Sequence, residues 1–293
     1  PLLLWEESPN STSEAILQKI WKNDQYCTII DSHILNLHRR YMPELHKVYT
    51  FKSADKIAWA IHIKNTRLLS KITSWFKHKK TKKLTTQLKR KYYDFMKFDP
   101  YNLKTFLQRI ETRLPKYKET FIKAAIKYEL PWELLAAVGY QESYWDPLAQ
   151  SPTGVRGLMM LTRRTAKEMK VKNRLDPIQS IEGGAKYLRK LMSYIPDYIH
   201  PEDKIWYVLA SYNVGYYHLR DAMSLTILQN KNPSRWHDVK QVLPLISHKK
   251  YYIHLPYGHA RGLEPVIYVD RIKDFYDIIK KKEAQTAPIK IYN

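Results

Sequence analysis

The sequence has little cysteine, glycine and acid. Cys27 is the only cysteine among 293 residues, which excludes an internal disulfide, and we expect it to be a small buried hydrophobic residue. No apolar run approaches the ~20 residues that a membrane-spanning helix needs. Asp and Glu number 28 against 50 Lys and Arg, for a formal net charge of +22. This balance favours an anionic partner, which can be nucleic acid, an acidic membrane face or an acidic polymer.

Several ligand-binding patterns are also missing. The 11 histidines include no His-Glu-x-x-His spacing, and Gly183 and Gly184 lack the rest of a phosphate-binding loop. Neither a zinc-finger spacing nor an aromatic RNA-binding signature accompanies the positive charge. We therefore predict no metal, no cofactor and no nucleic-acid partner, and we expect a monomer.

The positive charge is concentrated between Lys64 and Lys91, where eleven Lys or Arg occur without one acid. One interpretation is a solvated helical face. The other is contact with an anionic membrane surface, because Trp75 and Phe76 lie beside the basic residues and could enter the lipid interface. Composition alone does not separate the two.

The pattern of apolar residues changes near Pro100. Residues 1–98 mix β-like runs ("CTIID", "IAWAIHI") with helical stretches, which predicts an α/β module. Beyond Asn102 the periodicity is helical, so we predict a mainly α-helical domain over 99–282, a tail over 283–293 and an α+β protein overall. Because the chain begins with Pro1, we expect a fragment or a processed product. The first helix face of the second domain is formed by Leu103, Phe106, Leu107, Ile110 and Leu114.

One carboxyl group in the second half of the chain has unusual surroundings. The stretch "LLAAVGYQESYWDPLAQSPTGVRGLMML" begins as a buried helix, and Glu142 occurs in its expected last turn. Aromatic and aliphatic neighbours and the negative end of the helix dipole both raise the pKa of a carboxyl group there. A Glu that is protonated near neutral pH can act as a general acid. The alternative is a surface Glu at a helix end with no function.

Polar and glycine-rich segments follow Glu142. Ser151 begins a loop in which Gly154 and Gly157 would let the backbone pass close to a ligand. Further on, "LASYNVGYYH" has Tyr212 and Asn213 at the end of a predicted helix, where Asn213 can also be a simple helix cap.

Two other local patterns predict helices in this domain. In "EPVIYVDRI", Glu264, Tyr268 and Ile272 recur one turn apart and so share one helix face. A Glu on such an apolar face is either paired or near a site. Asp176 before Pro177 predicts a capped helix start.

Together these segments resemble the lysozyme-like catalytic domain of family 1 lytic transglycosylases, over roughly Pro100 to Lys281. The family has Glu-Ser at a helix end, a Ser-x-x-Gly-x-x-Gly-Leu-Met-Gln loop, Ala-Tyr-Asn, and a Tyr-Val pair on a later helix. Here these motifs are, in order, Glu142-Ser143, Ser151 to Met160, Ser211-Tyr212-Asn213 and Tyr268-Val269. Met160 replaces the usual Gln and Ser211 the usual Ala; one branch of the family itself has Met at the former position.

The resemblance implies a peptidoglycan lyase. Such enzymes need one Glu, because the C6 hydroxyl of N-acetylmuramic acid attacks its own C1 and a 1,6-anhydro product forms. Glu142 would act as general acid and then as base. The remaining site residues implied by the resemblance hold the substrate or Glu142: Ser151, Met160, Tyr212, Asn213, Tyr268 and, lining a sugar site, Tyr140.

The resemblance extends to location and to the first module. It implies glycan strands of peptidoglycan as partner and a periplasmic location, associated with the outer membrane. "YMPEL" and "AWAI" in residues 1–98 are similar to the last part of a solute-binding-protein-like regulatory module. Two other functions stay open: a goose-type lysozyme, which uses water in place of the C6 hydroxyl, and an inactive murein-binding or regulatory protein.

Overall fold

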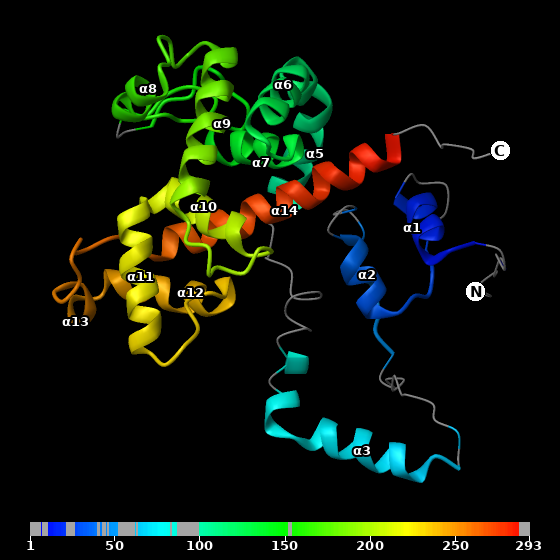
Figure 1. Cartoon of the computed structure of the whole chain (residues 1–293). Helices are drawn as coiled ribbons and strands as arrows, with labels where there is room; N and C mark the ends of the chain where they lie inside the picture. Colours follow the sequence, from blue (N-terminus) through cyan, green and yellow to red (C-terminus); the bar gives the residue numbers. More distant parts are fainter. Residues whose placement is uncertain are drawn as a thin grey trace. The chain divides into compact units, whose positions relative to one another are not determined.

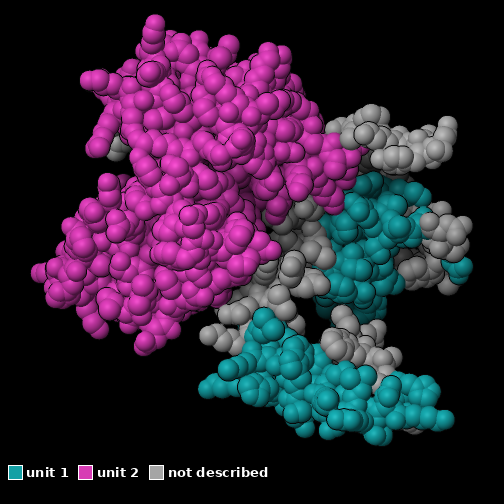
Figure 2. Space-filling model, in the orientation of Figure 1, with its two compact units in different colours: residues 1–104 teal, residues 105–293 magenta. Residues whose placement is uncertain are grey.

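The structure is a computed structural model that describes residues 7, 11–21, 27–39, 42, 45, 47–51, 62, 64–82, 84–86, 100–151 and 154–286. Within these residues all regular secondary structure is helical, apart from two isolated β-bridges (Figure 1). The chain divides into two compact units, Pro1–Lys104 and Thr105–Asn293 (Figure 2). Each unit is described by itself.

The first unit contains short helices with a small apolar core. They are α1 (Ser13–Trp21), α2 (Ser32–Arg39) and α3 (Thr66–Lys77). Helices α1 and α2 contribute to a cluster of the buried residues Leu17, Leu35, Met42 and Leu45. Helix α3 buries none of its residues. Much of its apolar surface therefore remains accessible.

The α/β prediction for residues 1–98 is not confirmed. The "CTIID" run, residues 27–31, forms no strand, and Cys27 is exposed, so its predicted burial was wrong. A strand needs a neighbouring strand for its backbone hydrogen bonds, and the described part of this unit contains none. Apart from His62, the "IAWAIHI" run lies outside the described residues.

The second unit is a bundle of helices, with its longest connection between α7 and α8 (Figure 1). In chain order the helices are α5 (Pro100–Thr112), η1 (Leu114–Lys116), α6 (Lys118–Tyr128), α7 (Trp132–Ser143), α8 (Arg163–Met169), α9 (Pro177–Tyr194), α10 (Lys204–Val214), α11 (Tyr216–Leu228), α12 (Trp236–Val242), η2 (Leu243–Ser247), α13 (Lys249–Tyr252) and α14 (Leu263–Thr286). Within the described residues no helix combines the length and apolarity needed to cross a bilayer.

Helix α7 is the centre of this unit. Every residue from Leu134 to Tyr140 is buried, as expected for a helix that is apolar on all sides. It packs against α14 and α6, and α14 also packs against α10. The long α14 runs beside both α7 and α10 in Figure 1. The C-terminal end of α7 is thereby fixed relative to α10 and α14.

Local sequence signals explain several helix starts and faces. Asp176 caps α9 by accepting a hydrogen bond from the N–H of Gln179, with Pro177 as the first helical residue, which confirms that prediction. The residues predicted to form the first buried helix face of the unit are all buried: Leu103, Phe106, Leu107, Ile110 and Leu114.

Candidate active site

Glu142 lies in the last turn of α7, as predicted. The helix ends at Tyr144, a left-handed residue whose N–H donates to the carbonyl of Tyr140 at 2.8 Å. Trp145 is also left-handed, and its buried indole N–H donates back to the Ala136 carbonyl at 2.9 Å. The chain therefore reverses sharply after Glu142. The Ser143 hydroxyl lies 2.8 Å from the Leu158 carbonyl oxygen, which ties the helix end to the following loop.

The Glu142 carboxyl group is held by a tyrosine from α14. The Tyr268 hydroxyl donates a hydrogen bond to Oε1 of Glu142 at 2.5 Å. Although Glu142 keeps some accessible surface, dense packing around its carboxyl group raises its pKa from 4.5 to about 7, because desolvation disfavours the charged form. The hydrogen bond from Tyr268 opposes this rise. Glu142 is therefore close to half-protonated at neutral pH.

Two tyrosine hydroxyls near Glu142 remain neutral donors. Burial, and then the charge of Glu142, raise the pKa values of Tyr212 and Tyr268 well above 10.0. Tyr212, in the last turns of α10, donates its hydroxyl to the Met159 carbonyl at 2.8 Å. Helices α7, α10 and α14 thus bring Glu142, Tyr212 and Tyr268 together, with the backbone of Met159 bound beside them.

The loop from Ser151 to Leu161 is fixed by its own backbone and by Arg174. The Gly157 N–H donates to the Ala149 carbonyl at 3.0 Å, and the Arg174 guanidinium donates to the carbonyls of Gly154 and Leu161 at 3.0 and 2.8 Å. Pro152 and Thr153 lie outside the described residues.

Gly157 has a role in the fold that was not expected from the sequence. A Cβ on Gly157 would lie 1.7 Å from the backbone oxygen of Arg174, and its φ is +82°. Gly157 is required because two backbone segments meet there. Gly154 has a φ of +81°, and a Cβ there would meet nothing within 4 Å. The approach of this backbone to a ligand stays a prediction.

Three other predicted residues lie at the ends of these elements. Met160 is half-buried and left-handed, with a φ of 48°, a conformation that non-glycine residues adopt at a cost. Ser151 is half-buried, and its N–H donates to the Val155 carbonyl at 3.1 Å. Asn213 is exposed in the last turn of α10. Contact of these residues with a substrate stays a prediction.

Tyr140 is a core residue, so its predicted place in a sugar site was wrong. It is 2% exposed, and its ring lies 4.4 Å from Phe106 and 4.7 Å from both Trp145 and Phe275. Its hydroxyl accepts a hydrogen bond from Arg109 at 3.4 Å. Because Tyr140 is two residues before Glu142, its side chain leaves α7 on the opposite side.

Sequence reasoning missed two residues that support the site. The buried hydroxyl of Ser180 on α9 accepts the Met159 N–H at 3.1 Å. Tyr187, two turns later on α9, has its ring 5.4 Å from that of Tyr212. No local signal distinguishes Tyr187 among 23 tyrosines. Ser180 occurs in an ordinary helical sequence.

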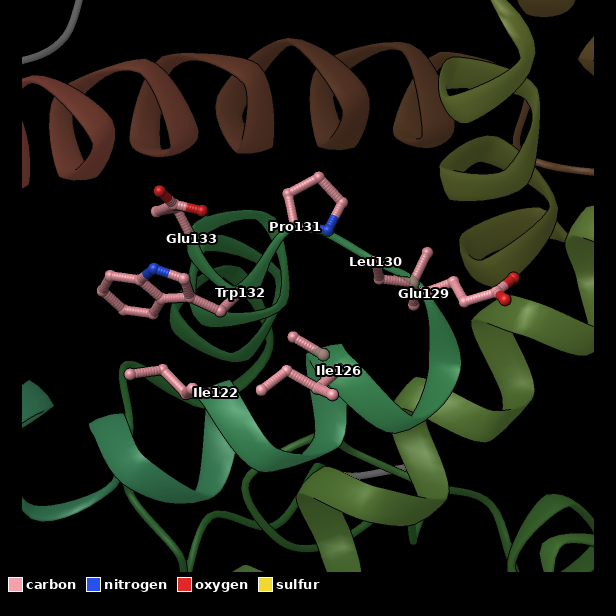
Figure 3. A pocket seen from close by; sticks show the side chains of 8 residues that line it. Ile122, Ile126, Glu129, Leu130, Pro131, Trp132 and Glu133 are labelled. Atoms are coloured by element: carbon pink, nitrogen blue, oxygen red, sulfur yellow. The ribbon is translucent and has the colours of Figure 1, made fainter.

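One pocket beside α7 lies away from Glu142. A pocket of about 420 Å³ is formed mainly by apolar side chains, with Glu129 and Glu133 at its edge (Figure 3). It adjoins Trp132 at the first turn of α7, about 15 Å along the helix from Glu142. Among the described residues no group of three or more His, Cys, Asp or Glu could hold a metal ion.

Comparison with protein families finds one match within the second unit. Residues 119–234 match the family described as "Transglycosylase SLT domain". The match includes the helix end with Glu142, the following loop and Tyr212. This segment of the chain is therefore similar to transglycosylase SLT domains.

Individual relatives extend the similarity over nearly the whole chain. "Membrane-bound lytic murein transglycosylase F" of Shewanella sediminis is 44% identical over 281 residues, which are 95% of this chain and 58% of that protein. The protein of the same name from Shewanella pealeana is 42% identical over 304 residues, 99% of this chain and 63% of that protein. This chain spans about three fifths of the length of these relatives.

Among solved structures, one that is similar to part of this chain can be named. It is the lytic transglycosylase Slt of Pseudomonas aeruginosa, with a TM-score of 0.44 and 20% identity over 59% of this chain and 25% of that chain.

Proposed function

We propose that this chain is a lytic murein transglycosylase, which cleaves the β-1,4 bond between N-acetylmuramic acid and N-acetylglucosamine without water. The observation that carries the proposal is Glu142, a desolvated carboxyl group with a pKa of about 7 and a hydrogen bond from Tyr268. The transglycosylase SLT domain around it and the names of the relatives support the same activity.

The pKa of Glu142 suits two successive proton transfers. Protonated Glu142 gives its proton to the glycosidic oxygen while the bond from C1 to that oxygen breaks. The resulting carboxylate takes the proton of the C6 hydroxyl, whose oxygen bonds to C1. Tyr268 donates to the carboxylate that exists between the two transfers. The cycle consumes no water and returns Glu142 to its protonated form.

A single carboxyl group supports the transglycosylase over the hydrolase. Glycosidases that use water normally need two carboxyl groups near the bond. Among the described residues, no second carboxyl group contributes to the pKa shift of Glu142. In the transglycosylase reaction the substrate itself supplies the second reacting group. The experimental test must distinguish this reaction from that of a goose-type lysozyme, which uses water.

Product masses test the proposal. We expect purified murein treated with this chain to release fragments ending in 1,6-anhydro-N-acetylmuramic acid, because the C6 hydroxyl replaces water as nucleophile. Mass spectrometry distinguishes the two, since each hydrolytic cut adds one water. Hen-type lysozyme digestion of the same murein provides the hydrated control. Reducing muramic ends from this chain would assign it to the hydrolases, and intact murein would leave only a binding or regulatory protein.

The wider assignment follows from this activity. Residues 99–282 form the proposed catalytic domain, 283–293 a tail and 1–98 the end of a solute-binding-like regulatory module. Glycan strands are the proposed partner, held by Ser151, Met160, Tyr212, Asn213 and Tyr268. The proposed location is the periplasm, in association with the outer membrane; the relatives are named membrane-bound.

Helix α3 is the candidate for contact with an anionic membrane. Leu68, Leu69, Ile72, Trp75 and Phe76 fall within one third of the helix circumference, and the rest of the surface is polar or basic. Four of these side chains are more than a third exposed, and the Trp75 and Phe76 rings lie 4.9 Å apart. An exposed apolar face beside cations is suited to the interface of an acidic bilayer.

Charge removal tests this contact. We expect the full chain to bind vesicles of mixed neutral and acidic lipids, with affinity that falls steeply as salt rises. Neutralising four basic residues should weaken binding by at least tenfold, at about 1 kcal/mol per cation. Cosedimentation with the vesicles measures the effect, and a matched variant controls for net charge. The four residues are Lys79, Lys80, Lys82 and Lys83, and the control neutralises the exposed Lys116, Lys167, Lys172 and Lys249. Equal losses in the two variants would leave the basic run as a solvated face.

A further inference from the structure

A row of tyrosines leads away from Glu142 along α9. Tyr187 contacts Tyr212, the residue beside Glu142, at a ring distance of 5.4 Å. Tyr194 follows two turns later on the same face of α9, about 10 Å along the axis. The pKa of Tyr187 is raised by burial and by nearby Tyr194. Tyr187 and Tyr194 therefore form a row on one face of α9 that begins at the candidate active site.

The row continues from α9 onto α11 and the loop before α14. The Tyr216 hydroxyl donates to the Tyr194 carbonyl at 2.8 Å, and the two rings lie 5.4 Å apart. The Tyr217 ring lies 5.7 Å from Tyr216 and 4.7 Å from Tyr257. We call Tyr187, Tyr194, Tyr216, Tyr217 and Tyr257 the tyrosine track. It joins three segments that are distant in sequence.

Three members of the tyrosine track are exposed. Tyr187 and Tyr216 are half-buried, whereas Tyr194, Tyr217 and Tyr257 are 42%, 56% and 45% exposed. Single exposed aromatic residues need no explanation, but contiguous exposed rings mark a binding surface. Tyrosine suits such a surface because its ring contacts apolar faces while its hydroxyl remains hydrated.

The outer end of the tyrosine track is held by the fold. Asp221 of α11 is 2% exposed, and its carboxylate accepts the backbone N–H of Tyr257 at 3.1 Å. Breaking this hydrogen bond would take a donor away from a buried carboxyl group, which is costly. The bond therefore holds the loop in place at Tyr257. The Tyr216 hydrogen bond to α9 fixes the middle. A partner that binds here loses little energy to ordering of the surface.

Positive charges border the tyrosine track. The Lys190 ammonium, which is ion-paired with Glu168, lies 5.5 Å from the centre of the Tyr194 ring. Burial raises the pKa values of Tyr216 and Tyr187. The positive charge of Arg220 opposes this rise at Tyr216, and that of Arg164 opposes it at Tyr187. Both guanidinium groups are therefore close to the track. Cations beside aromatic rings suit a ligand with flat apolar faces and carboxylate groups.

We propose that the tyrosine track binds the glycan strand beyond the bond that is cut, with sugar rings stacked on the tyrosines and acidic peptide stems beside the cations. This inference rests on the proposed function, because it extends the same substrate outward from Glu142. It predicts that long strands are bound more tightly than the shortest cleavable fragment. The track then serves to keep the enzyme on a strand.

The test uses strands of two lengths and a chain that does not consume them. In the full-length Glu142→Gln background, Tyr194→Ala and Tyr217→Ala are combined, and binding to purified uncrosslinked glycan strands and to a murein tetrasaccharide is measured by calorimetry. We expect about tenfold weaker binding of strands and less than twofold change for the tetrasaccharide. Removing the peptide stems enzymatically should weaken strand binding of the parent while leaving the tyrosine effect in place.

Two controls make the outcome decisive. Tyr49→Ala with Tyr251→Ala removes two tyrosines outside the track, and its binding should match the parent; equal circular dichroism and melting confirm that all variants fold. Equal strand binding by the track variant and the parent would overturn the proposal, as would an equal loss in the control. These outcomes differ from failure of the proposed function, in which the unsubstituted chain yields no anhydro products.

Discussion

Glu142→Gln is expected to lower the rate of murein cleavage by at least about 10² to 10⁴, the usual contribution of a general acid–base group. Gln keeps the size of the side chain and can accept the hydrogen bond from Tyr268, which is 2.5 Å long with Glu142. It has no proton to give to the leaving oxygen and cannot take one from the C6 hydroxyl. Release of soluble fragments from labelled murein measures the loss. Glu264→Gln, at an exposed residue paired with Arg261, is the matched control and should retain full activity.

The contribution of Glu142 to the stability of the parent protein should depend on pH in the opposite sense from that of most carboxyl groups. The pKa of Glu142 is raised by burial from 4.5 to about 7, so the folded protein holds this proton more tightly than the unfolded chain. Stability from Glu142 is thus full below pH 4.5 and is lost as pH rises toward 7, by up to about 3 kcal/mol.

A comparison at two pH values tests this linkage. Glu142→Gln removes the titration, so the variant should match the parent at pH 4.5 and exceed it at pH 8 in urea unfolding. Activity of the parent should also fall as pH rises through 7, because the general acid loses its proton. A variant that is less stable than the parent at pH 8 would contradict a desolvated Glu142.

Local patterns in the sequence predict the framework of this site well. Burial on all sides of α7 follows from its apolar run, and the capped start of α9 follows from Asp176 and Pro177. The direction of the Glu142 pKa shift was also predicted correctly, although the tyrosines beside its carboxyl group, Tyr212 and Tyr268, come from distant segments. The first two features depend on residues within a few positions of each other.

Features that depend on distant segments could not be predicted in the same way. Tyr140 and Tyr268 both looked suitable for the site, yet only Tyr268 reaches Glu142, because Tyr140 leaves α7 toward Phe106 and Phe275. The β-like "CTIID" run forms no strand, since strand formation depends on a partner elsewhere in the chain. Periodicity identifies a helix face but does not say which element covers it.

Substitution of Gly157 is expected to have the second large effect, here on stability, because a backbone segment distant in sequence lies against this glycine. Gly157→Ala is expected to destabilise the protein by about 3 kcal/mol or more. The new Cβ would lie 1.7 Å from the Arg174 carbonyl oxygen, and the φ of +82° adds strain for any residue with a side chain. Because this oxygen belongs to the backbone, the clash is relieved only if the chain at Arg174 moves. The Arg174 side chain holds the same loop through the Gly154 and Leu161 carbonyls.

Gly154→Ala separates the contact from the strain. Gly154 has nearly the same φ, +81°, but open space around its missing Cβ, so its substitution should cost only the backbone strain, about 1 kcal/mol. Urea unfolding of the two variants measures the difference directly. Activity should follow stability, because the loop containing Gly157 delivers the Met159 carbonyl to Tyr212 beside Glu142. Similar losses for the two variants would mean that strain, and not the approach of Arg174, explains why glycine is needed at position 157.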